Sequence, residues 1–130
     1  MRPVFAITAA VVIALVLGAC GTEGISVSKD DPTYRGAVLF SERCSGCHTL
    51  TAAGTQGSAN RAVRVQGPNL NQRVETVKDV LFAIRNGGFS GAIMPQNIVV
   101  GEDAQAVAEF VAENAGTDAK APPGLSSGQK

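Results

Sequence analysis

The sequence predicts an all-α domain with three main helices. Three segments, which begin near residues 32, 77 and 102, repeat apolar residues at the three- and four-residue intervals of a helix. No stretch alternates apolar and polar residues convincingly enough to predict a strand. A chain of 130 residues has room for one domain plus tails. Aromatic residues make up only 5% of it, so the core is thin unless a bound group fills part of it.

The first predicted helix begins at Asp31-Pro32. Asp31 can cap the helix, and Pro32 suits the first helical position, where a missing N–H has no consequence. One face of the helix carries Ala37, Phe40 and Cys44. Gly36 inside this helix costs about 1 kcal/mol relative to alanine. We expect the close approach of another helix to offset that cost.

The second and third predicted helices have clear ends. Thr76 caps the second, with Asp79 at the capping-box position, and Asn86-Gly87-Gly88 ends it. Glu102 and Asp103 open the third, where acidic side chains favour the positive end of the helix dipole, and Gly116 ends it. The buried stripes of the two helices contain Val77, Val80, Leu81, Ile84, Val107, Phe110 and Val111.

The segments between the helices are predicted to be loops. Residues 49–66 are small and polar without periodicity, which predicts a long surface loop. Residues 89–100 are irregular and carry Met94-Pro95.

The motif Cys44-Ser45-Gly46-Cys47-His48 is the attachment signature of a c-type haem. Each thiol can form a thioether with one haem vinyl group, and the imidazole then reaches the iron. His48 is the one histidine of the chain. Two alternatives for the cysteine pair are a redox disulfide and part of a zinc site. No strand pattern precedes Cys44, and no second pair of zinc ligands follows.

A second axial ligand is expected in the loop after the second helix. Met94 is the one methionine besides Met1, it lies on no helical stripe, and Pro95 would stiffen the backbone next to it. A thioether ligand opposite histidine raises the reduction potential and leaves no vacant position on the iron. Lys78 and Lys120 are other candidate ligands by type. Pro68 is a candidate to accept the remaining ring N–H of His48 through its carbonyl group.

The N-terminus predicts export and membrane attachment. Arg2 precedes an apolar run from Val4 to Leu17, which ends in Leu17-Gly18-Ala19-Cys20 and resembles a bacterial lipoprotein signal. Cys20 would then carry lipid and begin the mature protein. An ordinary cleaved signal and an uncleaved anchor are the alternatives, although the run is short for a span of about 20 residues. All three interpretations of the N-terminus place the domain outside the cytoplasm. In the lipoprotein case, the domain would lie on the extracytoplasmic face of a bacterial membrane.

The predicted organisation has four parts. Residues 1–19 form the signal peptide, residues 20–31 a lipidated tether, residues 32–116 the domain and residues 117–130 a disordered tail. The chain has 11 basic and 11 acidic residues, and no basic block indicates nucleic-acid binding. Strong electrostatic steering toward a charged partner is not expected.

From Pro32 to Gly116 the chain resembles a class I cytochrome c. The resemblance rests on Gly36-x-x-x-Phe40, Cys44-x-x-Cys47-His48, Gly67-Pro68-Asn69-Leu70, Met94-Pro95 and the last helix with Phe110. It implies the cytochrome c fold around one covalently bound haem c, with the first and last helices crossing almost at right angles. It also implies that Pro68 accepts a hydrogen bond from His48 and that Met94 is the distal ligand. The long loop after His48 and the scarcity of lysine around the motif depart from the family pattern.

We therefore expect a membrane-tethered monohaem electron carrier rather than an enzyme. Its expected partners are redox proteins: a membrane quinol-oxidising complex and a terminal oxidase or dehydrogenase. One alternative is a fixed cytochrome c subunit of an oxidase or dehydrogenase complex. A remote alternative is a haem-free thiol–disulfide or metal-binding lipoprotein.

Overall fold

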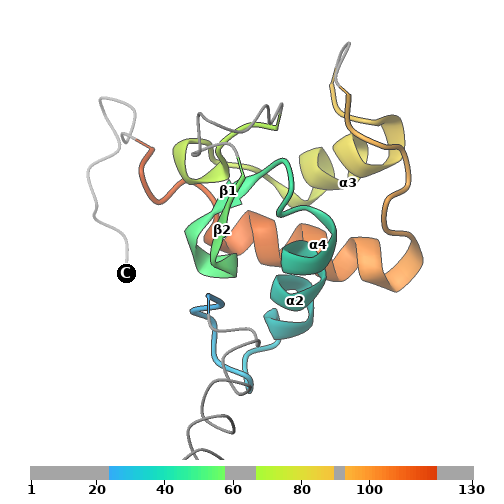
Figure 1. Ribbon diagram of the computed structural model, residues 1–130. Helices are drawn as coiled ribbons and strands as arrows, with labels where there is room; N and C mark the ends of the chain where they lie inside the picture. The colour runs from blue at the N-terminus through green and yellow to red at the C-terminus, as the bar shows by residue number, and fades with distance from the viewer. Residues whose placement is uncertain (1–23, 58–66, 90–92, 120–130) are drawn as a thin grey trace, which may run out of the picture.

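Three α-helices and a short hairpin make up the described part of the chain, which comprises residues 24–57, 67–89 and 93–119 of the computed structural model (Figure 1). The helices are α2 (Tyr34–Arg43), α3 (Val77–Asn86) and α4 (Gly101–Asn114). The shorter elements are β1 (Thr49–Leu50), η1 (Thr51–Ala53), β2 (Thr55–Gln56) and η2 (Leu70–Gln72). The three predicted helices are thus all present. Within the described residues no helix is both long enough and apolar enough to cross a membrane.

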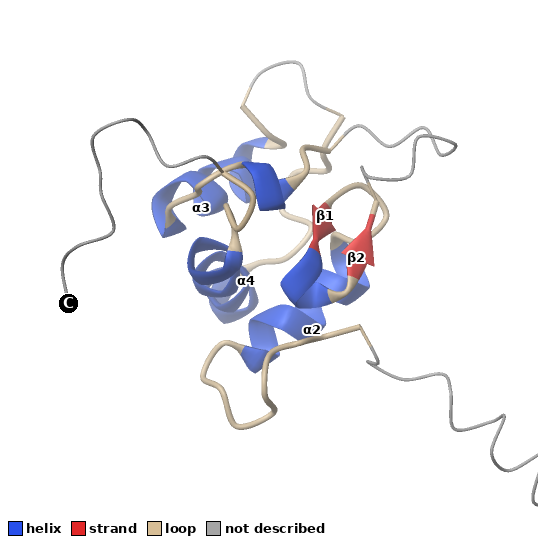
Figure 2. Cartoon of the chain, turned by 90° about the vertical axis from the view of Figure 1, so that its left-hand side faces the viewer, coloured by secondary structure: helices blue, strands red, loops and turns tan. Residues whose placement is uncertain are grey.

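Helices α2 and α4 cross in direct contact, as Figures 1 and 2 show. The contact is tightest at Gly36, where a Cβ atom would lie 2.1 Å from the carbonyl oxygen of Ala106 and 2.6 Å from the Cβ of Phe110. One turn further on, the rings of Phe40 and Phe110 are tilted against each other with their centroids 6.0 Å apart. The glycine in α2 is therefore explained by the close approach of another helix, as predicted.

The core lies between α4 and the elements packed on it. The largest fully buried side chains are Phe40, Phe110, Leu50, Val107 and Val111. Helix α3 packs on α4 as well and buries Ile84, which belongs to the same apolar cluster. The cluster therefore joins all three helices to the hairpin after α2.

The start of α2 differs from the prediction by two residues. The Asp31 carboxylate accepts hydrogen bonds from the backbone N–H of Thr33, at 2.7 Å, and from its hydroxyl, at 2.6 Å. Both bonds hold the pKa of Asp31 below its ordinary value. Asp31 therefore shapes a turn before the helix instead of capping it, and Thr33 takes the N-cap position without a side-chain cap.

The predicted ends of α3 are confirmed. The Thr76 hydroxyl accepts the backbone N–H of Asp79 at 3.2 Å and donates to the Asp79 carboxylate at 2.6 Å. Gly87, at the C-cap, has a φ of +73°, which glycine adopts without strain. Helix α4 begins at Gly101, one residue before the predicted Glu102, and Gly116 follows its C-cap with a φ of +77°.

A two-stranded antiparallel hairpin follows α2 where no strand was predicted. Thr49 pairs with Gln56 and Leu50 with Thr55 (Figure 2). The Thr55 hydroxyl accepts the N–H of Leu50 at 2.9 Å and donates to the carbonyl of His48 at 3.0 Å. Two residues per strand are too few to show an alternating pattern in the sequence. The predicted surface loop over residues 49–66 is therefore wrong for its first part, and residues 58–66 lie outside the described residues.

Residues 24–27, within the predicted tether, contact the domain. The N–H of Ser26 donates to the carbonyl of Ala52 at 3.0 Å, and Ile25 and Val27 contact the core. Cys20, the predicted signal peptide and the rest of the tether lie outside the described residues.

The chain after α4 also contacts the domain. The N–H of Asp118, in the first part of the predicted tail, donates to the carbonyl of Asn71 at 2.7 Å. The remainder of the predicted tail, residues 120–130, is outside the described residues.

Candidate functional site

The cysteine motif forms a tight turn at the end of α2. Cys44 is the C-cap of this helix, and its N–H donates to the carbonyl of Phe40 at 2.8 Å. The carbonyl of Cys44 then accepts the N–H groups of Cys47, at 3.1 Å, and His48, at 2.9 Å. Cys44 is buried and Cys47 is exposed. The helix and the turn together fix the two thiols and the imidazole relative to one another.

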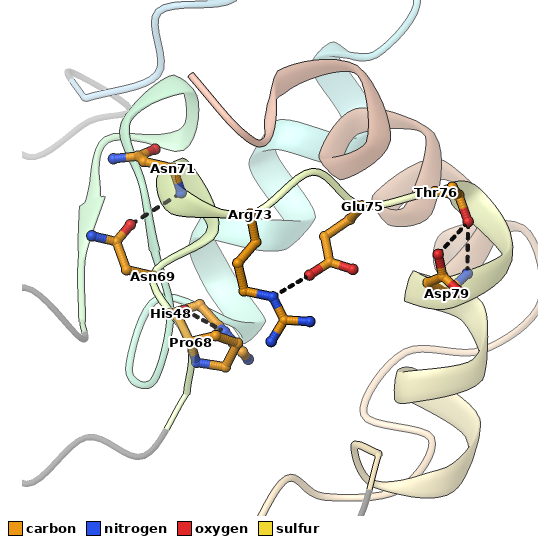
Figure 3. A network of polar contacts seen from close by, with 8 residues as sticks. All are labelled: His48, Pro68, Asn69, Asn71, Arg73, Glu75, Thr76 and Asp79. Carbon is orange, nitrogen blue, oxygen red and sulfur yellow. Dashed lines mark hydrogen bonds and ion pairs between the residues drawn. The ribbon is translucent and has the colours of Figure 1, made fainter. Parts of the chain in front are cut away.

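The His48 ring is held by Pro68, as Figure 3 shows. Nδ1 lies 3.1 Å from the Pro68 carbonyl oxygen, so the predicted hydrogen bond is present. A carbonyl can only accept, and Nδ1 must therefore carry the proton, which leaves Nε2 with a free lone pair. Burial lowers the pKa of His48, and this effect outweighs the opposing effect of the Pro68 hydrogen bond. The neutral form that can bind a metal is thus favoured.

Gly67 has a role that the sequence did not reveal. A Cβ atom at this position would lie 2.5 Å from the Cys47 carbonyl oxygen and 2.8 Å from His48 Nδ1. The chain segment that carries Pro68 can approach His48 this closely because residue 67 has no side chain. The Gly67-Pro68 pair was visible in the sequence as a turn, but its contact with the cysteine motif was not.

A pocket of about 290 Å³ opens next to the motif. Cys44, Cys47, His48, Pro68 and Met94 all line it, so every predicted site residue in the described part of the chain meets there. The remaining walls are largely apolar and come from all three α-helices, from η2 and from the loop before α4: Phe40, Leu70, Val80, Ala83, Ile84, Ile98, Val107 and Val111. We call this cavity the haem pocket, because the cysteine motif that borders it has the attachment signature of a c-type haem.

Met94 reaches the haem pocket from the segment between α3 and α4. It is half-buried and packs against the core cluster. The segment is tied to α3, because the N–H of Asn97 donates to the Ile84 carbonyl at 2.8 Å. Lys78, an alternative ligand by type, is exposed and does not line the haem pocket, and Lys120 lies outside the described residues.

Charged groups line one part of the haem pocket. Arg73 Nε lies 2.9 Å from Glu75 Oε1 (Figure 3). Both side chains belong to the wall, together with those of Arg43 and Asp79. Arg73 and Glu75 were not identified from the sequence. They lie in an irregular segment between η2 and α3, where no periodicity indicates which way a side chain points.

The buried thiol of Cys44 is held in its neutral form. Burial raises the pKa of Cys44 to about 11, and the neighbouring Cys47 adds to the effect. Within the described ranges, no group of three or more His, Cys, Asp or Glu side chains is placed to hold a metal ion.

The comparison with known proteins assigns the family. The family model described as cytochrome c oxidase, cbb3-type, subunit III matches residues 31–111, well over half of the chain. The protein belongs to this cytochrome c family. Among solved structures, the cytochrome matches the c-type cytochrome SorU from Sinorhizobium meliloti with 32% sequence identity and a TM-score of 0.49. The match covers 68% of this chain and 95% of SorU. None of the curated proteins matches the sequence.

Membership of the family identifies the cofactor of the cytochrome as covalently bound haem c. The residues of the haem pocket fit this group, because two thiols, a neutral imidazole and a thioether meet between apolar walls. The protein is therefore an electron-transfer haem protein with a cytochrome c fold. The alternative in which Cys44 and Cys47 carry no haem, and instead exchange a disulfide or bind a metal, is wrong.

Proposed function

We propose that the cytochrome is a class I monohaem protein that carries single electrons and makes or breaks no substrate bond. Cys44 and Cys47 would form the two thioethers, and His48 and Met94 would be the axial ligands. The observation that carries the proposal is the meeting of these four side chains in one apolar pocket. A haem bound there supplies a one-electron couple, and His/Met ligation raises its potential.

The surrounding residues prepare the site for this role. Pro68 fixes the tautomer and orientation of His48, so that Nε2 is the nitrogen offered to a metal. The apolar walls limit the access of water, and a dry environment disfavours the more highly charged oxidised state. Two protein ligands leave no position for a small molecule, which favours electron transfer over oxygen chemistry.

The visible spectrum of the matured protein tests this proposal. The reduced protein should be low-spin and should not change on addition of carbon monoxide, because both axial positions are filled. A high-spin spectrum with rapid carbon monoxide binding would show that His48 and Met94 are not both ligands.

A fixed subunit of a larger oxidase is the second candidate, because the matching family is described as an oxidase subunit. A fixed subunit and a mobile carrier would have the same haem spectrum. Purification after gentle solubilisation distinguishes them. A stoichiometric oxidase or dehydrogenase partner supports the subunit, whereas a cytochrome that purifies alone supports a carrier between a quinol-oxidising complex and its acceptor.

We further propose that lipid on Cys20 holds the cytochrome on the extracytoplasmic face of a membrane. Residues 24–27 contact the domain, so only residues 20–23 would separate the lipid from the first of these contacts. Four residues span at most about 14 Å, which limits the carrier to partners in the same membrane. Replacement of Cys20 by serine should release the cytochrome from the membrane fraction if this proposal is correct.

A further inference from the structure

Glu75 is a shielded carboxylate in the wall of the haem pocket. Its side chain is 9% exposed, and that of its partner Arg73 is 50% exposed. In the view of Figure 3, the Arg73 side chain lies between that of Glu75 and the His48–Pro68 pair. The two charges thus occupy the same part of the pocket as the predicted proximal ligand.

A charge with so little access to water requires a partner. Glu75 has one in Arg73, which donates through Nε and keeps both Nη groups for other contacts. Among the described residues, no other side-chain hydrogen bond to the Arg73 guanidinium is found. Removal of the Glu75 carboxylate would therefore free a long, half-exposed side chain to leave the pocket wall.

Both charged side chains line the same pocket as the His48 ring. Charges in the wall of this pocket would act on a haem bound in it, because Coulomb interactions in a partly buried site extend over several ångströms.

We propose that Glu75 is a positioning residue that holds Arg73 at the wall of the haem pocket, and that the pair sets the reduction potential of the bound haem. The inference rests on the proposed function, since it requires a haem next to His48. Reduction adds one negative charge to the haem centre. The Glu75 carboxylate opposes that addition and lowers the potential, whereas the Arg73 guanidinium favours the addition and raises it. The potential with both residues present reflects the balance of these two opposite effects.

The test is a redox titration of the matured holoprotein, of four single variants and of the Arg73→Gln, Glu75→Ala double variant. Glu75→Gln removes the charge but keeps an oxygen that can accept the Arg73 Nε–H. Glu75→Ala removes both, and Arg73→Gln removes the partner. Glu109→Gln is the matched control, because Glu109 is exposed on α4, outside the haem pocket, and pairs with Gln105.

Glu75→Gln should raise the equilibrium constant for reduction about tenfold, which equals about 59 mV for one electron. Arg73→Gln should lower it several-fold. In the Glu75→Ala background, the shift in potential caused by Arg73→Gln should be at least twofold smaller. The reason is that without Glu75 the Arg73 guanidinium is no longer held at the pocket. Glu109→Gln should leave the potential unchanged.

Two results would overturn the inference. One is a potential for Glu75→Gln equal to that of Glu109→Gln, and the other is the same effect of Arg73→Gln in both backgrounds. If either Glu75→Gln or Arg73→Gln prevents haem incorporation, the other variant still tests the inference. Glu75→Gln alone must raise the potential, and Arg73→Gln alone must lower it. A wild-type spectrum that is not low-spin would instead contradict the proposed function itself.

Discussion

Gly36 and Phe110 meet at the crossing of α2 and α4, so closely that a Cβ on Gly36 would lie 2.6 Å from the Cβ of Phe110. The backbone of Ala106 is closer still, at 2.1 Å from the same position. Neither a Cβ nor a helix carbonyl can turn aside as the end of a flexible side chain can. The crossing of these two helices therefore depends on the absence of a single methyl group.

Gly36→Ala should destabilise the holoprotein by about 1–3 kcal/mol, because the new methyl group forces α2 and α4 apart. Chemical denaturation followed by the visible absorption of the haem measures this loss. Gly46→Ala is the control, since no atom of the described chain lies within 4 Å of a Cβ placed there. Equal stability of the two variants would show that the crossing is not as tight as described.

Gly67→Ala should disturb the proximal side of the haem. Its Cβ would meet Cys47 O and His48 Nδ1, so the chain must shift and the His48–Pro68 hydrogen bond must lengthen. We expect a loss of about 1–3 kcal/mol in stability and a change in the visible spectrum of the haem. Pro68→Ala is the matched variant, because it keeps the carbonyl group that accepts from His48. Its spectrum should remain that of the wild type, and a disturbed one would assign the role to the proline ring instead.

Met94→Ala should open the iron and lower the potential. Loss of the thioether removes the ligand that favours reduced iron, and the potential should fall by on the order of 0.1 V, within the roughly 0.8 V range that axial ligands control. Carbon monoxide should then bind to the reduced protein. Lys78→Ala should change neither property, because Lys78 does not line the haem pocket. If Met94→Ala retained the wild-type potential, another residue would be the distal ligand.

The protein without haem should not fold stably. The haem pocket lies between all three helices, so the empty cavity would leave their inner faces partly unpacked. A Cys44→Ser, Cys47→Ser double variant should therefore show low helix content by circular dichroism. A native-like spectrum of this variant would show that the helices are sufficient by themselves.

Local patterns in the sequence predicted the features that depend only on residues close together in the chain. The helices around Phe40, Ile84 and Phe110 follow from helical periodicity, and the end of α3 follows from Thr76 and Gly87. The ligand set around His48 could be proposed because the cysteine motif places three of its groups within five positions. The contact at Gly36 could also be predicted, because a glycine inside a helix is destabilising unless a close contact offsets the cost.

The features that the sequence did not predict depend on contacts between distant segments. The hairpin at Thr49 and Thr55 is too short to have a period, and a hydroxyl group stabilises it. Ser26 belongs to the fold because of a hydrogen bond to Ala52, twenty-six positions away. Glu75 and Arg73 lie in a segment without regular structure, where only the folded chain shows that they line the same pocket as His48.

The most direct test of the account is denaturing electrophoresis with haem staining of the protein matured in a host that attaches haem to c-type cytochromes. Haem joined to Cys44 and Cys47 should remain with the denatured polypeptide, and the band should stain. The band should lose its stain in the Cys44→Ser, Cys47→Ser variant. A wild-type band that does not stain, from a host that matures other c-type cytochromes normally, would contradict covalent attachment and every proposal that depends on it.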